Sequence, residues 1–384
     1  MIAGRIIFAL SVLAVYFLSA AAYSQTGSGA SSAGDSPEIW FGPRQDAFEP
    51  GKGVTFSKYD FPQLVASTKG WERAAGEIST MDLNLVHIVE AYPDLASVVR
   101  WANDQPVKLA GGGSLVNTGM AVPGGGPSCS HPPIEGMGDD PRFDFAGEVY
   151  FTLHTWKQKG GRLDYLTMDG PFFFTYYYAK NFCNYTIEEA AQRTAITVNK
   201  ILADFPDAEI VDYEGPTKSL PEFFRDYEKY IKAFDALSMK PISRIGMDMH
   251  WADNQHDGYR WVDATRAYTK FAHAHSIKAG LFMDAEDQFV QSPDGSAITT
   301  TPVTNQSWMK MARDHIQLAH ASKLPLDFMI ITSWMKFPAL NLPETDSLAL
   351  TSLVDDAFRL WYPNCALQRK TYAACAGDVM RPAQ

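Results

Sequence analysis

The chain has 384 residues, 46% of them hydrophobic and 13% aromatic, and its formal net charge is −11. This length and composition suit one large hydrophobic core. Lysine and arginine are scattered along the chain rather than clustered into a basic face, so we expect no nucleic-acid partner.

The first residues are typical of an export signal. Met1 to Arg5 give a short positive start and Ile6 to Leu18 an apolar run, before an Ala-x-Ala site near Ala22 or an alternative cleavage site after Ser24. The apolar run is shorter than the roughly 20 residues that a membrane span needs. We therefore predict a signal peptide over residues 1–24 and a flexible Gly/Ser-rich linker over residues 25–37. The mature protein is expected to be secreted or periplasmic, with no membrane contact after signal cleavage.

The four cysteines are an even number in a chain predicted to be exported, which favours two disulfides over four free thiols. Cys365 and Cys375 would close a short loop in a C-terminal extension over residues 363–384. Cys129 and Cys183 would join two neighbouring loops. Their spacing matches no zinc site, and we predict no metal ion or other cofactor.

From residue 38 onward, short apolar runs alternate with longer amphipathic ones. Runs this apolar suit strands that are covered on both faces, as in a parallel sheet. The eight strand candidates are Glu38 to Gly42, Leu83 to Ala91, Pro106 to Gly112, Arg162 to Asp169, Ala208 to Glu214, Ile242 to His250, Ile277 to Ala285 and Leu326 to Trp334.

The clearest helical pattern between these strands runs from Thr186 to Phe205. Thr186 as N-cap and Glu189 three residues later form a capping box. Strand followed by helix, eight times, predicts the α/β class and a (β/α)8 TIM barrel as a single domain over residues 38–362. An open doubly wound sheet is the alternative, but the Gly-rich run Ala110 to Ser114 lacks the spacing of a dinucleotide-binding turn.

Acidic residues end four successive predicted strands. Active sites of such barrels form at the C-terminal ends of the strands. A carboxylate there loses solvation, so it is costly unless it is paired, hydrogen-bonded or used. A capping or salt-bridging role competes for any single acid, whereas four together favour a functional site. The polar residues at these ends are Asp169, Glu214, Asp248 with His250, Asp284 with Glu286, and Glu90 near the end of the second strand.

Aromatic residues accompany these acids, and six of the seven residues from Phe172 to Tyr178 are aromatic. Sugars stack their apolar faces on such rings, and rings that exclude water raise the pKa of a nearby acid. We predict substrate contacts from Phe172, Tyr176 and three tryptophans at strand ends, Trp40, Trp251 and Trp334. Packing of the loop against the barrel rim is the alternative for about half of the rings in this run.

With these acids at its strand ends, the chain resembles the (β/α)8 glycoside hydrolases over most of residues 38–362. One group in that class carries glutamates after strands four and seven, whereas strand four here ends in Asp169. A second group, similar to α-galactosidases, carries an aspartate nucleophile at strand four and an aspartate acid at strand six. Asp169 and Asp248 fit this second placement better. The resemblance implies hydrolysis of a poly- or oligosaccharide by two carboxyl groups.

We predict Asp169 with Glu214 or Asp248 as the catalytic pair, and Glu90, His250, Asp284 and Glu286 as substrate-binding residues. Neighbouring strands lie about 4.8 Å apart and suit a retaining pair, whereas strands four and six leave room for the water of an inverting pair. Two alternatives remain open. Asp248 and His250, together with Asp169 and Glu214, could ligate a divalent metal ion in a barrel hydrolase, or the barrel could bind carbohydrate without catalysis.

Overall fold

The computed structural model describes residues 36–45, 47–49, 53–56, 60–113, 145–178, 185–216, 219–249, 260–286, 290–291, 298–299, 301–333 and 336–379. The chain divides into two units, Met1–Asp35 and Ser36–Gln384, and all described residues belong to the second. Within the described part of the chain, no helix is both long and apolar enough to cross a bilayer.

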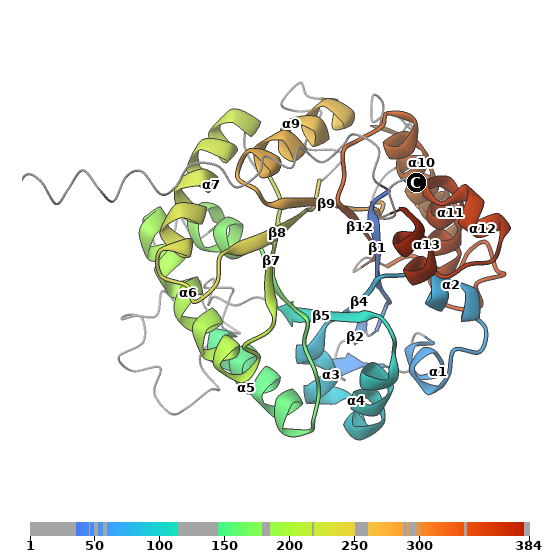
Figure 1. The fold of residues 1–384 in the computed structure, drawn as a ribbon, viewed down its shortest axis with the longest axis horizontal. Helices are drawn as coiled ribbons and strands as arrows, with labels where there is room; N and C mark the ends of the chain where they lie inside the picture. The colour runs from blue at the N-terminus through green and yellow to red at the C-terminus, as the bar shows by residue number, and fades with distance from the viewer. Residues whose placement is uncertain are drawn as a thin grey trace, which may run out of the picture. The chain divides into compact units, whose positions relative to one another are not determined.

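Eight parallel strands close into a barrel in the order β1-β12-β9-β8-β7-β6-β5-β4, which confirms the predicted (β/α)8 fold. Helices surround this barrel on its outside (Figure 1). The strands are β1 (Glu38–Gly42), β4 (Thr80–Leu83), β5 (Lys108–Gly113), β6 (Tyr165–Asp169), β7 (Glu209–Glu214), β8 (Ile242–Met247), β9 (Lys278–Phe282) and β12 (Phe328–Thr332).

The capping box predicted for the longest helix is confirmed. The Thr186 hydroxyl accepts a hydrogen bond from the Glu189 amide at 3.1 Å, and the Glu189 carboxylate accepts one from the Thr186 amide at 2.8 Å. This helix is α6 (Ile187–Asp204). The other helices include α1 (Phe61–Ala66), α2 (Glu72–Glu77), α3 (Leu85–Ala91), α4 (Leu95–Asp104), α5 (Phe145–Gln158), the π-helix η2 (Phe173–Tyr178), α7 (Leu220–Asp235), α9 (Trp261–Ala274), α10 (Asn305–Ala321), α11 (Thr351–Trp361), α12 (Pro363–Leu367) and α13 (Tyr372–Val379). Short antiparallel pairs are formed by β2 (Ala47–Glu49) with β3 (Gly53–Thr55), and by β10 (Val290–Gln291) with β11 (Ile298–Thr299).

The prediction for the second strand is wrong in position. The strand is Thr80–Leu83, and most of the predicted run forms helix α3 instead. The Asn84 side chain accepts a hydrogen bond from the His87 amide at 3.3 Å and so caps that helix. A short apolar run fits a buried strand and a buried helical face equally well, so periodicity alone does not separate them. Glu90 consequently lies exposed on a helix rather than at a strand end, so its predicted position is wrong, while its role as a substrate-binding residue stays a prediction.

Alternation along the strands divides their side chains between the barrel interior and the layer beneath the helices. Trp40 fills the interior near the N-terminal ends of the strands, where its ring centroid lies 4.8 Å from Tyr165 and 4.7 Å from Phe328. Arg244 lies over these rings and pairs with Glu38 at 3.2 Å. The interior therefore holds packed rings rather than a channel, as in other barrels of this size.

Hydrogen bonds join the N-terminal and C-terminal ends of the barrel segment. The Ser36 hydroxyl donates to the Trp361 carbonyl at 2.9 Å, and the Tyr362 hydroxyl donates to the Pro37 carbonyl at 2.9 Å. The last two residues of the predicted linker are therefore bound to the barrel unit. A disulfide joins Cys365 to Cys375, as predicted. Cys129 and Cys183 lie outside the described residues.

A buried glutamate on α2 makes stability depend on pH. Glu77 is 3% exposed, and burial, followed by the negative charge of Asp355, raises its pKa to about 8. The folded state therefore retains this proton at pH values where the unfolded chain has lost it, and the free energy of unfolding falls as the pH rises from about 4.5 to about 8. Glu77→Gln should therefore stabilise the protein at pH 8.5 and change it little at pH 4.5, which urea denaturation at the two values would measure. Equal effects at both pH values would contradict this account.

Candidate active site

Four strands of the barrel carry the dipeptide Met-Asp within two residues of their C-terminal ends. Every Met-Asp pair in the sequence lies at the C-terminal end of a barrel strand: β4, β6, β8 and β9. The four methionines are at most 1% exposed and pack beneath the helices. Because side chains alternate, the aspartate after each methionine belongs to the opposite, inward-facing set. Each of these four strands therefore directs one carboxyl group to the mouth, which is the opening at the C-terminal ends of the barrel strands. The four residues are Asp82, Asp169, Asp248 and Asp284.

Asp82 is the acid that the sequence analysis missed, because the second strand was misplaced. It is partly exposed, and its Oδ2 accepts a hydrogen bond from the Tyr213 hydroxyl of β7 at 2.8 Å. Burial raises the pKa of Asp82 to about 6; the Tyr213 hydrogen bond opposes this shift, and the charge of Asp169 adds to it. A carboxyl group with this pKa can hold a proton near neutral pH and give it up.

Asp169 is the last residue of β6, and its side chain is exposed. It lies in register with Tyr213 on the neighbouring strand. Gly170 follows with a φ of +56°, and its amide donates to the Tyr213 carbonyl at 2.7 Å. A Cβ at Gly170 would lie 2.7 Å from the Phe174 ring, so that ring covers the turn directly after the acid.

The other two acids follow β8 and β9. Asp248 is partly buried, and its amide donates to the Glu214 carbonyl at 2.9 Å. Asp284 is 7% exposed, and its own carbonyl accepts a hydrogen bond from His315 at 2.8 Å. Glu286, two residues further on, is partly exposed. All three were predicted from the sequence, and all three follow strands that supply the mouth.

Glu214 is not at the mouth, and the prediction that it is catalytic is wrong in this respect. It is 1% exposed, and it belongs to the outward-facing set of β7 together with Asp212, whereas Tyr213 faces inward. Its two carboxylate oxygens accept hydrogen bonds from the Phe172 and Phe173 amides at 2.7 and 3.0 Å. A carboxylate held by two backbone donors in the layer beneath the helices has no route to a substrate in the barrel.

Two predicted substrate-binding rings are corrected for the same reason. Trp40 and Phe172 are both 0% exposed, so neither ring offers a face to a sugar. Phe172 stacks on Tyr176 at 5.4 Å and on Tyr227 of α7 at 5.4 Å. Tyr176 is partly buried and packs against this core. These three rings attach η2 to the helical layer, which is the rim packing considered as the alternative.

Three predicted contact residues, His250, Trp251 and Trp334, lie outside the described residues. In the ranges that the structure describes, no three His, Cys, Asp or Glu side chains are grouped to hold a metal ion. The ligand set proposed for a metal site includes His250, so that alternative stays a prediction.

The Asp82–Tyr213 contact can be tested directly. Tyr213→Phe keeps the ring, whose centroid lies 4.9 Å from that of Phe282, but removes the donor that favours the ionised carboxylate. The pKa of Asp82 should therefore rise above about 6, whereas removing the neighbouring charge with Asp169→Asn should lower it. Carbon-13 chemical shifts of the labelled aspartate carboxyl groups, followed against pH, would measure both changes. Shifts of the same sign in the two variants would contradict the assignment.

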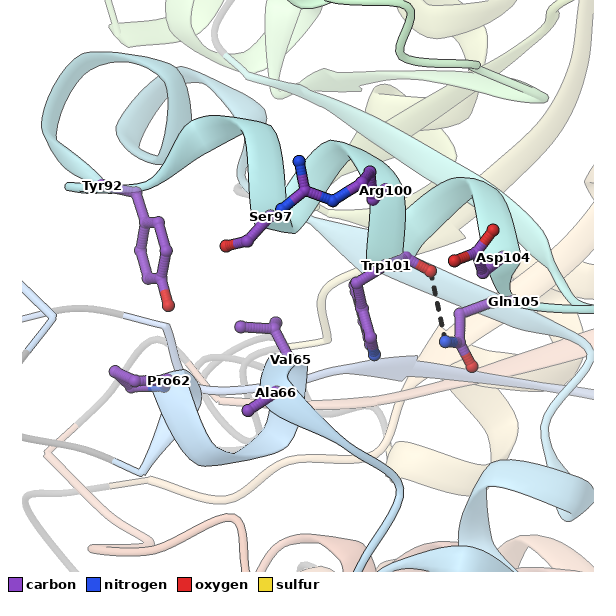
Figure 2. Close-up of a pocket in the computed structure, with 9 residues that line it drawn as sticks. All are labelled: Pro62, Val65, Ala66, Tyr92, Ser97, Arg100, Trp101, Asp104 and Gln105. Carbon is purple, nitrogen blue, oxygen red and sulfur yellow. Dashed lines mark hydrogen bonds between the residues drawn. The ribbon is translucent and has the colours of Figure 1, made fainter.

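A separate cavity of about 390 Å³ lies between α1 and α4, outside the barrel (Figure 2). Tyr92 and Trp101 line it together with Arg100 and Asp104. It shares no residue with the ring of aspartates at the mouth.

No protein-family model and no curated protein matches the chain. Solved structures of similar fold include a thermostable mutant of a xylanase from Cellvibrio japonicus, which is 12% identical, with 82% of this chain and 92% of that chain covered and a TM-score of 0.45. A GH10 protein from Paenibacillus barcinonensis is 12% identical over 86% of this chain and 95% of its own, with a TM-score of 0.48. A candidate alpha-L-fucosidase from Bacteroides thetaiotaomicron is 9% identical over 90% and 98%, with a TM-score of 0.46. Similarity at this level assigns no residue of this chain a role.

Proposed function

We propose that the protein is an exported glycoside hydrolase that cleaves a poly- or oligosaccharide with the aspartates at the barrel mouth. The observation that carries this proposal is the repeated Met-Asp strand end, which supplies four carboxyl groups to one opening. Glycoside hydrolysis needs one carboxyl group that donates a proton to the leaving oxygen and one carboxylate that acts as nucleophile or base.

The environments of the four acids differ in the way that this chemistry needs. Asp169 is exposed and supplies the ionised carboxylate, which attacks the sugar or activates water. The proton donor is Asp82, whose pKa of about 6 keeps part of the population protonated near neutral pH. Asp248 is the alternative donor, since aspartates at strands four and six form the pair that the α-galactosidase-like group carries. Asp284 and Glu286 are left to bind sugar hydroxyls.

The test is a product assay on the mature protein, which is incubated with neutral and charged polysaccharides with and without EDTA. Mass spectrometry should find products that have each gained one water, in equal amounts under both conditions. Loss of activity in EDTA would favour the metal-dependent alternative around Asp248 and His250. Binding of a polysaccharide without turnover would favour the carbohydrate-binding alternative.

N-terminal sequencing of the exported protein should find a start near Ser24 or Ala22, and an intact Met1 would overturn the export proposal.

A further inference from the structure

Glu214 contacts the backbone beside two of the proposed catalytic acids. Its carboxylate accepts hydrogen bonds from the Phe172 and Phe173 amides, in the turn that begins one residue after Asp169. Its own carbonyl accepts a hydrogen bond from the Asp248 amide at 2.9 Å. One residue on the outer face of the barrel therefore links the chain segments that carry two inward-facing acids.

The buried layer that holds the Glu214 carboxyl group contains a second acid, Asp212. Asp212 lies two residues earlier on the same face and is 0% exposed; its Oδ2 accepts from the Tyr227 hydroxyl at 2.7 Å, and its Oδ1 has no hydrogen-bond partner within the described residues. Burial raises the pKa of Asp212 to about 8, against the effect of the Tyr227 hydrogen bond. Two carboxylates in one buried layer do not both ionise, because each charge disfavours the other. Burial, followed by the charge of Asp212, also raises the pKa of Glu214 well above its usual value, against the effect of the Phe172 and Phe173 amides, so the two acids hold at least one proton between them near neutral pH.

We propose that Glu214 is a positioning residue: its buried carboxylate fixes the turn from Asp169 to Phe173, and through this turn it sets the direction of the Asp169 side chain. The catalytic consequence rests on the proposed function, whereas the effect on the turn does not. Without the carboxylate, two backbone amides would remain buried and unsatisfied, which costs more than two hydrogen bonds contribute. Gly170 makes this turn sharp, since its φ of +56° is open to glycine at little cost.

The matched pair Glu214→Gln and Asp212→Asn separates this role from simple burial of an acid. The glutamine keeps the volume but presents an amide NH2 to one of the two backbone donors, so one hydrogen bond is lost. The asparagine mimics the protonated aspartic acid that occupies this position already. If the substitution changes the direction of the Asp169 side chain, kcat of Glu214→Gln should be about 10- to 100-fold lower than that of the parent protein. Its KM should stay within about threefold of the parental KM. Small displacements of a reacting group have effects of this size. Its pH–rate profile should keep the shape of the parent, since Glu214 transfers no proton.

Hydrogen–deuterium exchange, followed by mass spectrometry on peptides covering residues 171–178, measures how often the backbone amides of this segment open to solvent. The measurement needs no substrate. Exchange there should increase at least about tenfold in Glu214→Gln and stay at the parent rate in Asp212→Asn, because loss of a buried acceptor promotes local opening. Unchanged exchange in Glu214→Gln would overturn the proposal. So would equal effects of the two variants, or a shifted pH–rate profile in Glu214→Gln.

Failure of the proposed function is distinguishable from failure of this inference. If the parent protein cleaves no sugar but Glu214→Gln alone opens the turn, the glycosidase proposal fails and the positioning role stands. If Glu214→Gln does not fold, Glu214→Asp takes its place: it keeps the charge, shortens the reach by one methylene, and should give the same selective opening of residues 171–178. A Glu214→Asp protein with parental exchange would then overturn the proposal.

Discussion

Asp169→Asn should abolish turnover while leaving the fold intact. Asparagine has the same shape but carries neither a negative charge nor a basic oxygen, and it can serve as neither nucleophile nor general base. We expect kcat/KM to fall at least about 10³-fold, in the range that loss of a catalytic carboxylate produces. The side chain is exposed, so the thermal midpoint should stay within about 2 °C of the parent, as for surface substitutions generally.

The control is Asp207→Asn, which removes an equally exposed carboxylate from the turn before β7. It lowers the net negative charge by the same amount, but at the N-terminal ends of the barrel strands rather than at their C-terminal ends. If both variants lose activity equally, the effect comes from overall charge rather than from the mouth. If Asp169→Asn keeps more than about a tenth of the parental kcat/KM, the residue is not the nucleophile or base, because that residual is too large for loss of such a group.

Gly112→Ala should prevent folding. A Cβ at this position would lie 1.8 Å from the Thr167 carbonyl oxygen on the neighbouring strand, and the nearest atoms belong to backbone that is held in the β5–β6 ladder. A clash of this depth separates two strands of a closed barrel. The cost should exceed about 4 kcal/mol, a large part of the 5–15 kcal/mol that stabilises a typical domain. Circular dichroism and the soluble yield would report the loss.

Gly113→Ala is the neighbouring control. Among the described residues, its Cβ would contact the Val86 side chain at 3.2 Å and the Val149 side chain at 3.7 Å, and both side chains can adjust. We expect a destabilisation of no more than about 1 kcal/mol for this change, as for ordinary substitutions. Equal loss of soluble protein in both variants would show that the β5–β6 contact is not what excludes a side chain at Gly112.

The barrel could be predicted from the sequence because the pattern of an apolar run followed by an amphipathic run is repeated along the chain. Seven of the eight predicted runs contain the observed strand or most of it, and the Thr186 capping box marks the start of α6. The prediction for the remaining run, Leu83 to Ala91, is wrong because a short and mostly apolar run suits a strand and a helix alike, and here Asn84 caps a helix. The predicted run begins at Leu83, so it leaves out the first three residues of β4, and Asp82 is one of them.

The site was harder to predict, because a strand that is covered on both faces does not reveal which face is the interior. On β7, Asp212 and Glu214 share one face and Val211 and Tyr213 the other, and both faces are mostly buried. The sequence predicts the last residue of the strand, Glu214, at the mouth, whereas the inward-facing residue is Tyr213. The recurrent Met-Asp pair is a sequence signal that could have found Asp82, since a buried methionine marks the outer face and the next residue must face inward.

The stacked rings below the mouth have a consequence for proton exchange. Trp40, Tyr165 and Phe328 fill the barrel beneath Asp82, with Arg244 packed over them, and Tyr213 lies above with its hydroxyl on that acid. These packed side chains separate Asp82 from the N-terminal end of the barrel, so we expect its proton to be exchanged through the opening that binds the sugar. In an inverting cycle Asp82 would then regain a proton through that opening after cleavage, whereas in a retaining cycle it would regain the proton from the water that releases the sugar.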